Sequence, residues 1–167
     1  MSRRSYATLQ PGSSLCSQHG SAHGVQRGTY ALLLLMNQAT SILVGRLGRI
    51  RFPAGSYVYV GSALGSGGLP ARLARHLRQA KKRHWHIDHL LAVAQIVHVR
   101  FDASGARLEC GWAQRLLQVP GAEVLMPGFG SSDCRCPTHL LYFGETTPPE
   151  LAELGTPADD AALRCAR

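Results

Sequence analysis

Acidic residues are missing from the first half of this 167-residue chain, in which Asp88 is the first carboxylate. Residues 1–87 hold twelve Lys and Arg and no Asp or Glu, whereas residues 88–167 hold six Lys and Arg and ten Asp and Glu. The charges of +12 and −4 sum to the formal net charge of +8. A one-signed field over half of a sequence is typical of a polyanion-binding protein. We therefore expect a nucleic acid partner, DNA rather than RNA; a basic surface kept only for solubility is the alternative.

Long apolar runs are also missing. The longest, "YALLLLM" at 30–36, has the length of a strand and falls far short of the roughly 20 residues that span a bilayer. Residues 1–26 lack the apolar core of a secretory signal, so we expect a disordered polar tail there, with a transit peptide as the alternative. We expect a cytoplasmic, nucleoid-compatible protein with one domain over 27–144 and a mobile tail over 145–167.

Lysine is missing before Lys81, which decides how the glycine-rich stretch "YVGSALGSGG" at 59–68 is interpreted. A Walker loop needs a Lys in the loop itself, and a dinucleotide fingerprint needs a third glycine where Pro70 stands. Both nucleotide-binding motifs are excluded. The glycines are expected to permit tight backbone turns before the next helix.

The pattern of apolar residues predicts a mixed α+β fold, with helices packed on a small antiparallel sheet. The strand over 41–45 is expected to pair with the first strand as a hairpin. Six basic residues lie on the first expected helix and are the expected nucleic-acid contacts: Arg72, Arg75, Arg78, Lys81, Lys82 and Arg83. Strands are expected over 28–36, 41–45, 57–60, 95–101 and 138–143, and helices over 70–83, 84–94 and 107–118.

Two tripeptides stand at strand positions: "GTY" at 28–30 opens the first expected strand, and "YVG" at 59–61 closes the third. Arg72 lies on the helix that follows, His76 one turn later, and Glu109 near the start of another helix. This order resembles the GIY-YIG nuclease superfamily. It is most similar to a branch of small prokaryotic proteins, some of them joined to a DNA-repair glycosylase, through "YVGSALG", "HWHID" and "SSDCRCP". The similarity covers about 28–143.

The resemblance implies a three-stranded antiparallel sheet flanked by helices and a metal-dependent endonuclease, acting in DNA repair or processing. Tyr30 and Tyr59 would face the active site, Arg72 would bind the scissile phosphate with His76 beside it, and Glu109 would hold Mg²⁺ or Mn²⁺. The residue types suit this chemistry. Nearby positive charge and the metal would lower the pKa of a tyrosine, an Arg fork matches phosphate, and a lone carboxylate suits magnesium.

Several departures from the superfamily pattern leave other interpretations open. Thr29 and Val60 replace the two isoleucines, and the interval from Tyr59 to Arg72 is longer than usual. A nucleic-acid-binding protein that has kept the fold without the catalysis is therefore the alternative. Taken without the resemblance, the two tyrosines are ordinary strand aromatics. Trp85 is expected in the core, with base stacking as the alternative.

Five cysteines without an export signal indicate a reducing compartment and free thiols. Cys134, Cys136 and His139 could bind zinc with His86 as a fourth ligand, although C-x-C is not the usual spacing. The alternative is that the thiols stay free while His86 and Asp88 make hydrogen bonds in the core. A metal-stabilised structural protein is thus a third class of function.

Overall fold

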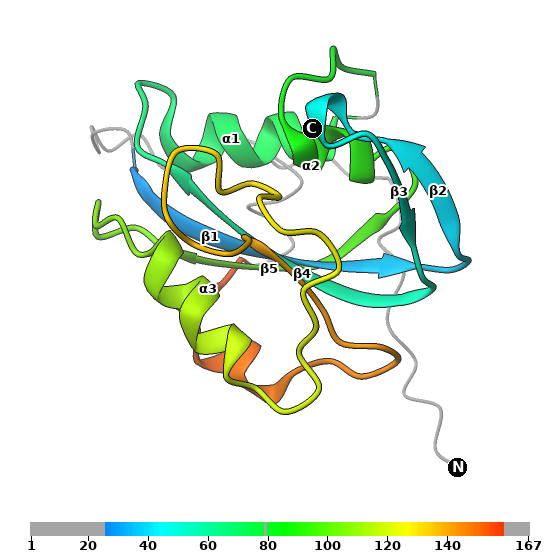
Figure 1. Cartoon of the computed structure of the whole chain (residues 1–167). Coiled ribbons are helices and arrows are strands. Elements are labelled where there is room, and N and C mark those ends of the chain that lie inside the picture. Colours follow the sequence, from blue (N-terminus) through cyan, green and yellow to red (C-terminus); the bar gives the residue numbers. More distant parts are fainter. Residues whose placement is uncertain (1–25, 79, 159–167) are drawn as a thin grey trace, which may run out of the picture.

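An antiparallel sheet forms the centre of the computed structural model, which describes residues 26–78 and 80–158 (Figure 1). The sheet has five strands in the order β6-β4-β1-β5-β7, and β2 and β3 form a separate hairpin. The strands are β1 Gly28–Met36, β2 Thr40–Leu43, β3 Arg49–Phe52, β4 Gly55–Ala63, β5 Gln95–Asp102, β6 Leu140–Tyr142 and β7 Thr156–Pro157. The helices are α1 Gly68–Leu77, α2 His86–Leu90 and α3 Glu109–Leu117, with 3₁₀ turns η1 Gly45–Leu47 and η2 Pro149–Glu153.

The sheet separates two apolar cores, because successive side chains of a strand point to opposite faces. Tyr30 and Leu32 of β1 face the core beneath α1 and α2, which also contains Leu73 and Leu90. The intervening β1 residues, with β4 residues of the same face, meet α3 and η2 on the other side (Figure 1). Strand β1 is consequently buried on both faces, as its nearly continuous apolar sequence predicts.

The α+β class is confirmed, but the expected three-stranded sheet is wrong because the sheet has five strands. The expected pairing of the second strand with the first is also wrong. β2 pairs with β3, while β1 lies between β4 and β5. β4 and β1 have the same length and pair along all of it, from Gly28 opposite Ala63 to Met36 opposite Gly55. Because β5 pairs along the other edge, β1 has no free edge for β2.

The first helix ends at Leu77 rather than at residue 83. Lys81 accounts for this end, since its ammonium group donates hydrogen bonds to the carbonyls of Arg75 and His76 in the last turn. The Asp88 carboxylate then accepts hydrogen bonds from the backbone N–H groups of His84 and Trp85. The segment between the helices is therefore fixed by side chains that satisfy its backbone, and α2 is only five residues long.

The mobile tail expected over 145–167 is wrong for residues 145–158, which pack on the domain. Leu151 and Leu154 are buried in the second core, and β7 pairs with β5. The Arg100 guanidinium donates hydrogen bonds to three carbonyls of this segment. Residues 159–167, and nearly all of the tail expected over 1–26, lie outside the described residues. No helix in 26–78 or 80–158 combines the length and the apolar character that a membrane crossing requires.

Candidate active site

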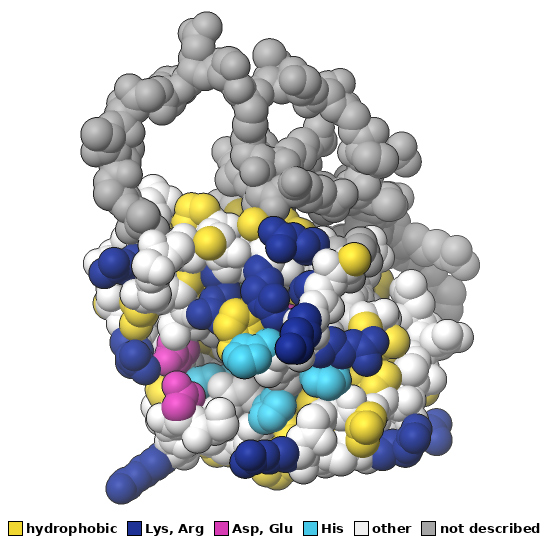
Figure 2. Space-filling model, turned by 90° about the horizontal axis from the view of Figure 1, so that it is seen from above, with side chains coloured by type: hydrophobic (Ala, Val, Ile, Leu, Met, Phe, Trp, Pro, Cys, Tyr) yellow, Lys and Arg dark blue, Asp and Glu magenta, His cyan; other side chains and the backbone are white. Residues whose placement is uncertain are grey.

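A polar cavity of about 350 Å³ opens beside α1 and α2, and β1, β4, α3 and the loop over 128–139 also contribute to it. On the face that carries α1 and α2, His side chains surround a hollow and Lys and Arg side chains gather beside them (Figure 2). All five residues that the sequence singles out for catalysis line this one cavity: Tyr30, Tyr59, Arg72, His76 and Glu109. Their convergence is the main finding about the site.

The two tyrosines enter the cavity from neighbouring strands. Tyr30 lies on β1 and Tyr59 on β4, with ring centroids 6.4 Å apart. Gly61 stands directly opposite Tyr30 in the register, and a Cβ on Gly61 would lie only 2.5 Å from the Tyr30 hydroxyl. The glycine that ends "YVG" therefore makes room for the aromatic ring that ends "GTY".

The Tyr30 hydroxyl is hydrogen-bonded to Nε2 of His76, at 2.7 Å, inside the protein. Burial, aided by the positive charge of Lys81, lowers the pKa of His76 to about 3. The ring is therefore neutral at pH 7 and keeps one nitrogen that can accept a proton. Its Nδ1 is buried and has no hydrogen-bond partner among the described residues.

Positive charge lowers the pKa of the two tyrosines as expected, but burial outweighs it and the net shift is upward. Burial raises the pKa of Tyr30 well above 10, and it raises that of Tyr59 as well. The charge of Arg72 acts in the opposite direction on both groups and is outweighed. The loss of hydration raises the pKa of a buried phenol by more than the charge of one neighbouring guanidinium lowers it. Both side chains are accordingly neutral phenols at pH 7.

Arg72 reaches the cavity from α1, supported by Trp85. Its guanidinium carbon lies 4.0 Å from the centroid of the Trp85 ring, and that of Arg75 lies 4.5 Å from it. Such contacts stabilise a cation over an aromatic face by about 0.5–1 kcal/mol or more. Trp85 also packs against the main core, as expected from the sequence. The indole thereby orients Arg72 toward the cavity.

Two of the six expected nucleic-acid contacts are engaged inside the protein instead. The Asp88 carboxylate lies 2.5 Å from Arg75 and 3.7 Å from Lys81, and the Lys81 side chain is only 7% exposed. Burial alone would raise the pKa of Asp88, but the backbone N–H groups of Trp85 and His84 and the Arg75 guanidinium lower it. Arg75 and Lys81 are thus engaged by Asp88, and their contact with a nucleic acid stays a prediction. The other members of the set line the cavity or are exposed: Arg72, Arg78, Lys82 and Arg83.

Glu109 begins α3 and is 5% exposed, at the edge of the cavity. Its Oε1 lies 3.5 Å from the exposed Arg107 guanidinium, whereas its Oε2 is buried without a hydrogen-bond partner among the described residues. A buried carboxylate oxygen without a partner is costly. A divalent cation with water ligands would satisfy it, so the donor set fits the Mg²⁺ or Mn²⁺ that the resemblance implies.

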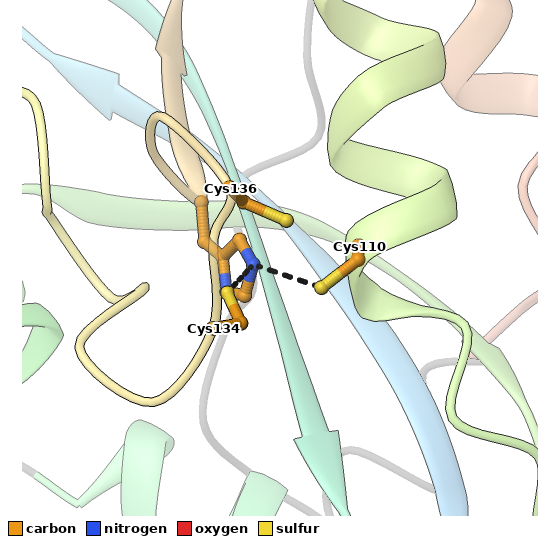
Figure 3. A group of neighbouring side chains, drawn as sticks. Cys110, Cys134 and Cys136 are labelled. Carbon is orange, nitrogen blue, oxygen red and sulfur yellow. Dashed lines mark hydrogen bonds between the residues drawn. The ribbon is translucent and has the colours of Figure 1, made fainter.

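A second group of potential ligands adjoins the cavity. Cys110, Cys134, Cys136 and His139 offer ligand atoms that all lie within 4.8 Å of one another (Figure 3). This Cys₃His cluster could hold a metal such as zinc. Three members were expected from the sequence, but the expected fourth, His86, is wrong. Nδ1 of His86 accepts a hydrogen bond from the backbone N–H of Gly130, at 3.2 Å.

Cys110 was missed because its neighbours in the cluster come from another part of the chain. It lies next to Glu109 at the start of α3, 24 residues before Cys134. No spacing motif connects the two. The only signal in the sequence was the presence of a further cysteine beside a candidate catalytic residue.

The fold and the site define an α+β protein in which an antiparallel sheet and its helices enclose a cavity lined with tyrosine, arginine, histidine and glutamate. Residues 29–156 match the sequence model of the family described as Domain of unknown function DUF123, so the chain belongs to this family. Searches among curated proteins and among solved structures found no significant match.

Proposed function

We propose that the protein is a metal-dependent endonuclease of GIY-YIG type that hydrolyses phosphodiester bonds in nucleic acid. The observation that carries this proposal is the convergence of Tyr30, Tyr59, Arg72, His76 and Glu109 on one cavity. These residues come from β1, β4, α1 and α3, and all five belong to the order of residues on which the resemblance rests. Five independent side chains in one place favour a common chemical task.

Arg72 is assigned to the phosphate. Its planar guanidinium can donate two parallel hydrogen bonds to non-bridging oxygens, which gain negative charge in the transition state. Because the Trp85 ring supports the guanidinium at 4.0 Å, the fork is oriented before the substrate arrives. The enlarged glycine loop before α1 does not keep Arg72 from the cavity that the tyrosines line.

Glu109 is assigned to Mg²⁺ or Mn²⁺, which its unpartnered buried Oε2 would bind. The chemistry that such an ion supplies is positive charge at the leaving oxygen and a bound water of lower pKa. The carboxylate sits at the first turn of a helix, so the backbone holds its position firmly.

The Tyr30–His76 pair is assigned to the attacking water. Both groups are neutral at pH 7, because burial raises the pKa of the phenol and lowers that of the imidazole. The pair therefore orients the water through hydrogen bonds and does not hold a ready phenolate. Tyr59 borders the same cavity and positions the substrate from the next strand.

The substrate is expected to be DNA, which the cationic half of the chain would attract. Arg78, Lys82 and Arg83 are exposed next to the cavity-lining segment and would contact flanking phosphates. A role in DNA repair or processing, in the cytoplasm or at the nucleoid, fits these assignments and is part of the proposal.

The test is nicking of supercoiled plasmid in the presence of Mg²⁺ or Mn²⁺. Arg72→Ala and Glu109→Ala should each lower the nicking rate by about 100- to 1,000-fold, because each removes charge stabilisation of the transition state. Arg49→Ala and Glu145→Ala change exposed charges outside the cavity and should leave the rate within about twofold. Equal rates in all variants, or no nicking by the wild type with varied metals and substrates, would contradict the assignment.

A protein that binds nucleic acid without cutting it is the second candidate. The raised pKa of both tyrosines favours it, since neither phenol is prepared to act as a base. Gel shifts in chelator and in Mg²⁺ separate the two candidates. Binding in both conditions with intact DNA after long incubation supports the second candidate, whereas binding in chelator and cleavage in Mg²⁺ supports the first.

A further inference from the structure

We propose that Cys110, Cys134, Cys136 and His139 bind a single zinc ion that fixes one wall of the cavity. In Figure 3, Cys110 points from α3 toward the loop cysteines, with an imidazole nitrogen between them. The Nε2 atom of His139 lies 3.4 Å from Sγ of Cys134 and 3.9 Å from Sγ of Cys110. The site stands on these residues alone and does not depend on the proposed nuclease activity.

The spacing of the ligand atoms matches one tetrahedral ion. With Zn–S near 2.3 Å and Zn–N near 2.0–2.1 Å, tetrahedral geometry places neighbouring sulfurs about 3.8 Å apart and a sulfur and a nitrogen about 3.6 Å apart. The two sulfur–nitrogen distances fall on either side of that value. Because all four ligand atoms lie within 4.8 Å of one another, they leave no room for a cluster of several metal and sulfide ions. Thiolates with imidazole at tetrahedral spacing select zinc among the common metals.

The site would join two segments that lie far apart in the sequence. Two backbone hydrogen bonds close the loop over 128–139 at its base, from Gly128 to Pro137 and from His139 to Phe129. Cys134 and Cys136 belong to this loop, whereas Cys110 belongs to the first turn of α3. A zinc ion would therefore tie the loop to α3.

The zinc site would affect the cavity, because residues next to its ligands in the sequence line that cavity. Cys110 directly follows Glu109, and Cys134 directly follows Asp133; both acidic residues line the cavity, as does His139 itself. Displacing the loop from α3 would thus open one wall of the cavity. Protein side chains would fill all four coordination positions of the zinc ion. No position is left for substrate, so the role is structural rather than catalytic.

The test begins with the full-length chain carrying Cys16→Ser and Cys165→Ser, which removes the two cysteines outside the described residues. Elemental analysis of protein purified without chelator should find about one zinc ion per chain. Replacement by Co²⁺ should give the intense visible absorption of tetrahedral cobalt with sulfur-to-metal charge transfer. Cys110→Ser and Cys134→Ser should abolish both signals and lower the melting temperature, because they remove a cross-link between α3 and the loop.

Two further variants separate metal binding from general loss of structure. His139→Cys keeps four soft ligands and should retain the metal with stronger charge transfer, while His86→Ala should keep full zinc content because His86 is not in the cluster. Far-UV circular dichroism of each variant shows whether the fold is kept. Absence of zinc and of tetrahedral cobalt from the folded parent, zinc content unchanged by Cys110→Ser, or a disulfide between cluster cysteines in freshly purified protein would overturn the proposal.

Discussion

The cavity has two walls of different construction. The strand–helix wall carries Tyr30, Tyr59, Arg72 and His76 on β1, β4 and α1, and the loop wall carries Glu109, Asp133 and His139 on the start of α3 and the loop over 128–139. In the first wall, sheet register and helical spacing fix the side chains, and buried hydrogen bonds hold them. In the second, two backbone hydrogen bonds close the loop at its base, and the proposed zinc ion would tie the loop to α3. Regular elements position a site by their geometry, whereas the irregular loop is the part that the proposed zinc ion would fix.

The strongest way to disrupt the strand–helix wall is Asp88→Ala. This substitution leaves Arg75 and Lys81 without their buried carboxylate and two backbone N–H groups without an acceptor. Removing one partner of a buried ion pair costs about 3–5 kcal/mol, and we expect a loss of that size in urea unfolding. Glu145→Ala, at an exposed carboxylate, is the control and should cost less than about 0.5 kcal/mol. Equal losses for the two variants would contradict the role given to Asp88.

A smaller and more local change is Gly61→Ala, which tests how closely the two tripeptides depend on each other. The new methyl group would lie 2.5 Å from the Tyr30 hydroxyl, against a ring enclosed in the core. We expect a loss of about 1–3 kcal/mol in thermal unfolding and a loss of nicking activity. Zinc content should not change, because the loop wall is untouched. Gly65→Ala, where a Cβ would meet nothing within 4 Å, should be close to neutral, and equal effects of the two would refute the packing argument.

The pH dependence of stability tests the strand–helix wall through its buried residue His76. Its folded pKa is about 3 and its ordinary value is 6.5, so between these values the unfolded chain binds a proton that the folded chain does not. Stability should therefore fall as pH decreases from 6.5 to 3, with a contribution from this residue of about 1.4 kcal/mol per pH unit. His76→Gln keeps a hydrogen-bonding group for Tyr30 but cannot titrate, so its unfolding free energy should fall less steeply. Identical pH curves for the two proteins would contradict the burial of a neutral His76.

The smallest expected effects are changes in the salt dependence of DNA binding, caused by substitutions that leave the stability of the fold nearly unchanged. Lys82→Ala and Arg83→Ala remove exposed cations and should each reduce the slope of log affinity against log salt by about 1. Lys81→Ala should leave that slope unchanged and lower stability instead, because its ammonium group caps α1 and faces Asp88. Anisotropy titrations with a labelled duplex at several salt concentrations measure the slopes. A slope change for Lys81→Ala equal to that for Lys82→Ala would show that the assignment of Lys81 to the interior is wrong.

The strand–helix wall could largely be predicted from sequence. Tyr30 and Tyr59 stand in strands with clear apolar patterns, and Arg72 and His76 are four residues apart, which places them on one face of a helix. A strand was expected where β6 lies, but β7 could not be predicted because it is only two residues long and carries little pattern of its own. The engagement of Lys81 by Asp88 could not be predicted either, because it depends on how the chain turns after α1.

The loop wall was less predictable. Glu109 was identified only through the resemblance, and Cys110 could not be grouped with Cys134 because their contact is set by the packing of α3. The direction of the tyrosine pKa shifts was also beyond the sequence. The net charge suggested that the pKa of each tyrosine is lowered. The balance between charge and burial depends on how deeply each ring is buried, which only the folded structure defines.

The most direct test of the central claim is a crystal structure of the protein with Mn²⁺ and a short DNA duplex carrying a non-hydrolysable phosphorothioate. We expect anomalous scattering from one Mn²⁺ beside the Glu109 carboxylate, and a phosphate held by the Arg72 guanidinium within reach of the Tyr30 and Tyr59 hydroxyls. DNA bound on another surface, or Mn²⁺ bound away from Glu109 with the cavity empty of phosphate, would contradict the proposed active site.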